Sequence, residues 1–254
     1  IQFINKKAYH NPLMITVANT VNIKNADLKL YFRTLIEVAK EKPSNFELLK
    51  QELIQKLFNN REYIFGDEEI DNNFLDSLGN ISYEDVLKNV FNSNSTGIIE
   101  CKKTASKDEI LFKIKTSSES SYFGLLKISD ISSWSNGILY DYDITEDLDD
   151  IGYFDSINEK DSSINILMGS KIFSEGWDSN RPNVINFLNI GSKDARKYVM
   201  QTIGRGVRIE PMPNLRKRIS SLSFNEEDEF KVSNELKNFN NSLINNTDIL
   251  NNNI

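Results

Sequence analysis

The sequence contains few of the residues that build covalent or metal-centred sites. In 254 residues there is one cysteine, Cys101, and one histidine, His10. A single cysteine excludes an internal disulfide and a cysteine-based metal cluster, so we expect Cys101 to pack in a strand and no metal to be bound. No apolar run reaches the ~18 residues that a membrane-spanning helix needs. The sequence therefore predicts a soluble, cytoplasmic protein without a membrane partner.

Two catalytic signatures are also absent from the sequence. There is no Gly-x-x-x-x-Gly-Lys-Ser/Thr phosphate-binding loop, and no acidic motif after an apolar strand that would hold Mg²⁺ beside a nucleotide. We therefore expect that the chain does not hydrolyse ATP by itself. A Glu-x-Lys spacing, as found in nucleases, is present at Glu100 and Lys102. Its composition is ordinary for a β-hairpin, and we assign no nuclease site to it.

The net charge of −7 argues against a nucleic-acid-binding protein, but the charges are unevenly distributed. Residues 181–218 contain nine lysines and arginines against two acids, a local charge of +7, whereas residues 141–161 have a local charge of −8. Because salt screens fields over about 8 to 10 Å, the local charge matters more than the net charge. The basic segment could therefore lie against phosphates, although without other motifs it would be interpreted as a solvated face.

The most informative segment is 201–208, Gln-Thr-Ile-Gly-Arg-Gly-Val-Arg. It places Arg205 and Arg208 three residues apart among glycines, after a helix predicted over residues 193–203. Arginine keeps its charge and can bond two phosphate oxygens at once, so the pair could neutralise charge during phosphoryl transfer. Gly204 and Gly206 would let the backbone approach a ligand or a neighbouring domain. One face of this helix carries Ala195, Tyr198, Val199 and Thr202.

The segment before this helix contains two apolar strands separated by a polar loop. Residues 163–168 and 183–190 are predicted to be buried strands, and residues 169–178 are predicted to be a polar, glycine-bounded loop or short helix between them. The polar residues thus follow strand ends, which is where ligands bind in open α/β sheets.

These segments resemble motifs V (170–178) and VI (201–208) of the second RecA-like domain of superfamily 2 helicases. The longer strings 166–185 and 201–211, with Glu-Gly-Trp-Asp and Gly-Arg-Gly-Val-Arg-Ile-Glu-Pro, are similar to the restriction (Res) subunit of type III restriction-modification enzymes. Residues 12–22 resemble the motif IV strand that opens the same domain. The close resemblance covers residues 12–40 and about 150–218.

The resemblance implies a RecA-like α/β fold, with a mainly parallel sheet flanked by helices, and half of a composite ATPase site. Arg205 and Arg208 would reach the phosphates of ATP, and Gln201 would help to place the attacking water. Gly176, Asp178 and Gly204 would also line the nucleotide. ATP and Mg²⁺ would be held mainly by a first RecA-like domain, so neither is expected to bind this chain alone.

The resemblance also implies double-stranded DNA and a modification methyltransferase subunit as partners of the whole enzyme. Asn19, Thr20, Ser170 and Lys171 would contact the nucleic-acid backbone, because short hydroxyl and amide side chains commonly position phosphates. The sequence departs from the family pattern at Lys171 and Glu175, where many of these helicases carry an acid and an arginine. The charge network at motif V therefore differs here.

The middle of the chain is less regular. Helices are predicted over residues 25–39, 45–58 and 83–91, and residues 44–47 and 82–85 resemble N-terminal caps of the last two. Three β-like runs follow at 97–103, 109–115 and 122–128. Because a β-meander fits poorly in a doubly wound sheet, we predict an inserted helical and β-hairpin subdomain. The expected units are 1–59 and 136–224 for the RecA-like domain, 60–135 for the insertion, and 225–254 for a C-terminal helix or linker.

Two other functions fit the same sequence. One is a related superfamily 2 helicase that acts on RNA or in repair. The other is a helicase-like domain that serves as an interaction platform, with idle ATP-facing residues. We favour the motor domain of an ATP-dependent type III restriction endonuclease subunit, because several independent motifs agree.

Overall fold

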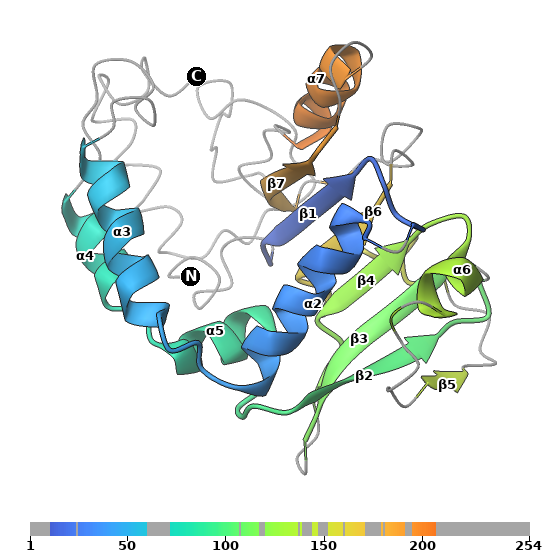
Figure 1. Cartoon of the computed structure of the whole chain (residues 1–254), viewed down its shortest axis with the longest axis horizontal. Coiled ribbons are helices and arrows are strands. Elements are labelled where there is room, and N and C mark those ends of the chain that lie inside the picture. Colours follow the sequence, from blue (N-terminus) through green and yellow to red (C-terminus); the bar gives the residue numbers. More distant parts are fainter. Residues whose placement is uncertain are drawn as a thin grey trace, which may run out of the picture.

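A seven-stranded sheet with helices on both faces forms the centre of the molecule in our computed structural model (Figure 1). The structure describes residues 11–59 except 24, 72–138 except 107, 117–119 and 137, and 144–146, 152–159, 161–170, 179, 181–190 and 195–206. The strand order is β5-β2-β3-β4-β6-β1-β7. The predicted class, an α/β protein with a mainly parallel sheet flanked by helices, is confirmed.

One half of the sheet is entirely parallel. It contains β4 (Gly124–Lys127), β6 (Ile166–Gly169), β1 (Leu13–Ala18) and β7 (Pro182–Leu188). The strands predicted near residues 12–22, 163–168 and 183–190 are thus β1, β6 and β7. β4 and β6 are apolar along almost their whole length, as expected for strands covered on both faces.

The other half of the sheet is mostly antiparallel. β2 (Ile98–Lys103) and β3 (Glu109–Lys115) form the predicted hairpin, with Lys103 opposite Ile110. β3 then pairs antiparallel with β4, and β5 (Ile144–Glu146) pairs parallel with β2 at the edge. Among the described strands, β2–β3 and β3–β4 are the antiparallel pairs, and all other pairs are parallel.

The expectation that the β-meander stands apart from the parallel sheet is therefore wrong. β4 bonds both to β3 and to β6, so the meander continues the same sheet. The reason is visible in β3, whose first four residues, Glu109 to Phe112, are all buried. A strand buried on both faces belongs in the interior of a sheet. The domain boundaries at 60 and 135 stay a prediction.

Three helices cover one face of the sheet: α2 (Asp27–Lys40), α5 (Tyr83–Val90) and α6 (Ile131–Asn136). Apolar side chains of these helices share one buried cluster with Phe112, whose ring centroid lies 4.6 Å from that of Phe32 in α2. Trp134 of α6 belongs to the same cluster, and its ring centroid lies 5.3 Å from that of Phe32. Such offset and edge-on ring contacts are the favoured aromatic geometries.

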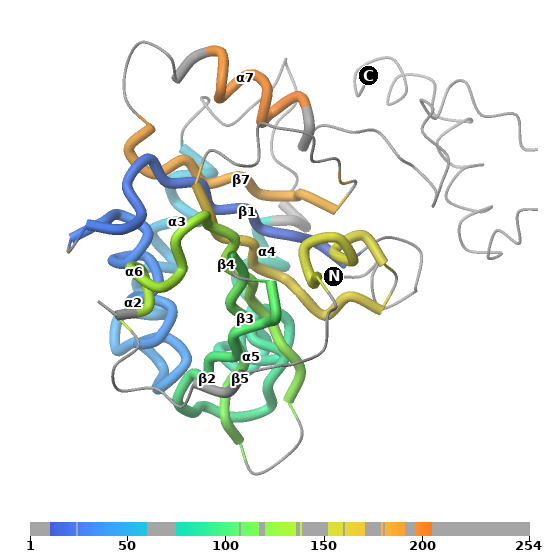
Figure 2. The backbone as a smooth tube through the Cα atoms, turned by 90° about the vertical axis from the view of Figure 1, so that its right-hand side faces the viewer, coloured from blue at the N-terminus to red at the C-terminus, as the bar shows by residue number. Residues whose placement is uncertain are grey.

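The opposite face is covered by α7 (Ala195–Gly206) and by the turn at 152–159. Tyr198 of α7 and Ile157 of the turn pack in one apolar cluster with Ile15 and Val17 of β1. Figure 2 shows α7 running back along β7 in the opposite direction, so its last residues lie toward the start of that strand.

The remaining helices are α3 (Phe46–Asn59) and α4 (Asn72–Gly79), which pack on each other at the side of the sheet (Figure 1). The helices predicted at 25–39, 45–58 and 83–91 correspond to α2, α3 and α5 and are confirmed. At α5 the predicted cap is also present, because Ser82 and Asp85 form a reciprocal capping box. Among the described helices, none combines the length and hydropathy needed to cross a membrane.

Candidate functional site

Three segments that are far apart in the sequence meet at one edge of the sheet. β1 pairs in parallel with β6 on one side and with β7 on the other. Val17 lies opposite Gly169 of β6, and Ala18 lies opposite Leu188 of β7. Because all three strands run in the same direction, the residues that follow them gather at the carboxyl edge, the usual ligand side of such sheets.

Asn19 and Ser170 both lie at this carboxyl edge. Asn19 is exposed, and its backbone N–H donates to the carbonyl of Leu188 at 3.3 Å. Ser170 directly follows β6 and is half-buried. The structure therefore brings together two of the four residues predicted to contact a nucleic-acid backbone. Lys171 lies outside the described residues.

Thr20, the fourth predicted residue, uses its hydroxyl within the protein. The hydroxyl donates to the Asp27 carboxylate at 2.9 Å and accepts from the Asp27 backbone N–H at 3.3 Å. Ala26, at the N-cap position of α2, has no side chain that could accept a capping hydrogen bond. The Thr20 hydroxyl takes this role by accepting the N–H of Asp27. A hydroxyl has one proton to donate, and here it goes to Asp27. The side chain of Thr20 thus fixes the loop and has no proton left for a phosphate.

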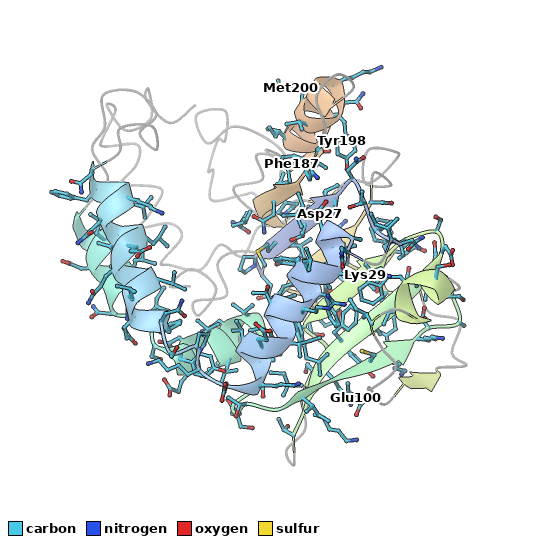
Figure 3. The ribbon with its side chains drawn as sticks, viewed as in Figure 1. Asp27, Lys29, Glu100, Phe187, Tyr198 and Met200 are labelled. Carbon is cyan, nitrogen blue, oxygen red and sulfur yellow. The ribbon has the colours of Figure 1, made fainter. Side chains whose placement is uncertain are left out.

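A buried lysine also bonds to the loop that follows β1. Lys29, in the first turn of α2, is only 2% exposed, and its Nζ donates to the carbonyl of Asn22 at 3.2 Å. Burial, together with the nearby Arg33, lowers the pKa of Lys29. Figure 3 shows Asp27 and Lys29 on α2. These contacts attach the loop after β1 to α2, so Asn19 is presented from a fixed backbone.

The structure also shows a charged network near the carboxyl end of β4 that the sequence analysis missed. Lys127, opposite Gly169, bonds Glu109 at 2.9 Å and Asp108 at 3.0 Å. Glu109 is only 1% exposed and accepts the backbone N–H of Tyr153 at 3.0 Å. All these charges have partners, and the network joins the 152–159 turn to the sheet. The sequence signal that could have indicated this network is Glu109, an acid at the start of an otherwise apolar strand.

The helix that resembles motif VI buries part of its predicted face. Tyr198 and Thr202 of α7 are buried, and the Thr202 hydroxyl donates to the Tyr198 carbonyl at 2.9 Å. Gln201 and Gly204 are exposed. The helix does not end at residue 203 as expected, because α7 continues through Gly204 to Gly206. A glycine in a helix costs only about 1 kcal/mol relative to alanine, which neighbouring helical residues can offset.

Gly204 provides a direct test of why glycine stands in this helix. A Cβ added there would meet no heavy atom within 4 Å. Gly204→Ala is therefore expected to raise the free energy of unfolding of this chain by about 0.5 to 1 kcal/mol in urea titrations. If Gly204 instead leaves space for a nucleotide or a facing domain, the added methyl group of alanine fills that space. Gly204→Ala should then lower the ATP turnover of an intact subunit. Unchanged turnover would show that the glycine has no such role.

The predicted phosphate-facing residues are only partly described. The backbone of Arg205 lies in the last turn of α7, and its side chain is outside the described residues, as are Gly176, Asp178 and all of Arg208. Since α7 runs back along β7 (Figure 2), the end of α7 lies away from the carboxyl end of β7.

Arg181, counted in the basic segment, is a buried structural residue. It is 2% exposed, and its guanidinium donates to the carbonyls of Asn11, Ile157 and Ile164. Burial lowers its pKa to about 10. Arg181 joins the segments before β1 and β6 to the start of β7, so it cannot contact DNA. Its interpretation as part of a basic DNA-binding surface is wrong, because formal charge does not reveal burial.

Cys101 and Glu100 of β2 have structural roles. Cys101 is fully buried in β2, and burial, followed by the charge of Glu100, raises the pKa of its thiol to about 12. The predicted packing role is confirmed, since the reactive thiolate is disfavoured. Glu100 forms an ion pair with Lys113 on the facing strand at 3.0 Å. In the described part of the chain no three His, Cys, Asp or Glu side chains cluster in a way that could hold a metal.

Comparison with known proteins gives no relative: no family model, no curated protein and no solved structure matches this chain.

Proposed function

We propose that this chain is the second RecA-like domain of a superfamily 2 motor, of the kind found in the restriction subunit of type III restriction enzymes. The observation that carries the proposal is the adjacency of β1, β6 and β7. The strands of the segments that resemble motifs IV and V, and the strand that leads to motif VI, are side by side and parallel. This arrangement is compatible with a RecA-like fold and is what a motor domain with these motifs requires.

In this proposal the carboxyl edge contacts the phosphate backbone of duplex DNA. Asn19 and Ser170 supply neutral hydrogen-bond donors there, from a loop held by Thr20 and Lys29 and from the end of a buried strand. Contacts of this type position a protein on nucleic acid without reading its sequence. Lys171 adds the charge that neutral donors lack.

The motif VI helix would face ATP held by a first RecA-like domain. Arg205 and Arg208 would neutralise charge on the phosphates during phosphoryl transfer, and Gln201 would orient the attacking water. Gly176, Asp178 and Gly204 would line the nucleotide. Mg²⁺ would be held by the first domain together with ATP. In the whole enzyme, ATP turnover would drive DNA restriction in partnership with a methyltransferase subunit.

DNA binding by this chain is expected to be weak, independent of sequence and strongly dependent on salt. If about three phosphates are neutralised, the slope of log K against log salt is near −2.7, so affinity falls about 40-fold between 50 and 200 mM salt. Fluorescence anisotropy with two labelled duplexes of unrelated sequence measures both properties. Binding that survives high salt, or that strongly prefers one duplex, would contradict the proposal.

A second candidate is the interaction platform. It is favoured by the outer face of α7, where Met200 is 68% exposed and Ile203 is 37% exposed (Figure 3). Contiguous exposed apolar surface is typical of a face that meets another protein, and these two side chains are three residues apart on one helix. The same face could meet the first RecA-like domain of a working motor. ATP turnover by arginine variants separates the two candidates.

A further inference from the structure

Asn189 is an exposed residue of the described chain with a left-handed backbone. It follows β7 directly and has a φ of 48°. The other described non-glycine residue with positive φ is Asn92, whose amide donates to the carbonyls of Tyr122 and Ser163. No bond to another described residue engages the side chain of Asn189. Left-handed residues of this kind cluster at binding sites.

The position of Asn189 places it in the carboxyl-edge group. Asn19 follows Ala18, Asn189 follows Leu188, and these two preceding residues are paired. On the other side of β1, Ser170 follows Gly169, which is opposite Val17. Ser170, Asn19 and Asn189 therefore end three adjacent parallel strands. Neighbouring strands are about 4.8 Å apart, so the row spans roughly 10 Å.

We propose that the side-chain amide of Asn189 binds the sugar–phosphate backbone of the nucleic acid, as the third member of a row with Ser170 and Asn19. This inference rests on the proposed function. It adds a third contact residue and the direction in which the nucleic acid crosses the sheet. A row of about 10 Å is long enough to contact neighbouring phosphates of one strand. The nucleic acid thus crosses the carboxyl edge from β6 over β1 to β7.

The chemistry of the row fits a phosphate backbone. Its three side chains are an amide, a second amide and a hydroxyl, all of which can donate hydrogen bonds, and none is an acid. The left-handed backbone is tolerated by asparagine more readily than by most residues, so the amide can be kept where the chain must turn. Glycine would fit this backbone without strain but would provide no donor.

Asn189→Gly separates the two roles of the residue, because it permits the backbone and removes the amide. We expect the Kd for a fluorescein-labelled duplex to rise about tenfold, the equivalent of one hydrogen bond to a charged group. The slope of log K against log salt should stay unchanged, since a neutral amide releases no counterion. The midpoint of thermal unfolding should not fall. Asn189→Asp should weaken binding further by repelling phosphate.

The matched control is Asn183→Ala, which removes an exposed amide at the opposite end of the same strand and should leave the Kd unchanged. If Asn189→Gly and Asn189→Asp both bind the duplex like the unmodified chain, the role of Asn189 is overturned while the proposed function stands. If the unmodified chain does not bind DNA even at low salt, the proposed function itself fails. If Asn183→Ala raises the Kd as much as Asn189→Gly does, the proposed contact row of Ser170, Asn19 and Asn189 is overturned.

Discussion

Replacing Arg208 by alanine in an intact subunit, where this chain works with a first RecA-like domain, is expected to lower ATP turnover by about 10³-fold or more. Removal of an arginine finger has an effect of this size because the guanidinium stabilises charge that is largest in the transition state. ATP binding and folding should change little, since most nucleotide affinity comes from the phosphate loop of the other domain. Steady-state turnover with saturating DNA, together with a nucleotide-binding titration, measures both effects.

Arg208→Lys serves as the control for charge alone. It should rescue little turnover, because an ammonium group lacks the planar fork that bonds two phosphate oxygens. Arg205→Ala should behave like Arg208→Ala, and DNA cleavage should be lost with ATP turnover. A folded, ATP-binding Arg208→Ala subunit with near-normal DNA-stimulated turnover would instead favour the interaction platform.

Replacing Arg181 by methionine is expected to reduce the free energy of unfolding by at least about 3 kcal/mol. Methionine fills much of the space but leaves the carbonyls of Asn11, Ile157 and Ile164 without their donor. A buried acceptor without a partner costs about 1 to 3 kcal/mol, and two of these three bonds, to Ile157 and Ile164, are buried. Domains are commonly stable by only 5 to 15 kcal/mol, so the change is large.

Urea unfolding followed by circular dichroism measures this loss. The matched control is Lys197→Met, which removes an exposed cation of the same basic segment and should change stability by no more than about 0.5 kcal/mol. Arg181→Lys should be intermediate, because one ammonium cannot reach three carbonyls in the guanidinium geometry. Equal stability of the two methionine variants would contradict the structural role of Arg181.

The candidate site was predictable in part. The position of Ser170 and the buried stripe of α7 follow from local patterns, since polar residues after an apolar strand and a periodic helix face are visible in the sequence. Asn19 was expected only from the resemblance to motif IV. The engagement of Thr20 with Asp27 was not predictable, because its hydroxyl meets a residue that is placed only when α2 folds onto the loop. Asn189 was missed for a similar reason: its left-handed φ exists only where β7 ends beside β1.

The sequence by itself determined the elements whose stabilising contacts are local. The hairpin of β2 and β3, the helix α2 and the Ser82 capping box depend on residues close together in the chain, so alternation, helical period and cap spacing were sufficient. Only the tertiary structure decided which strands are neighbours. The pairing of β4 with β6 and the burial of Arg181 join segments far apart in sequence. No local pattern records such contacts, because their energy comes from surfaces that exist only after the chain has folded.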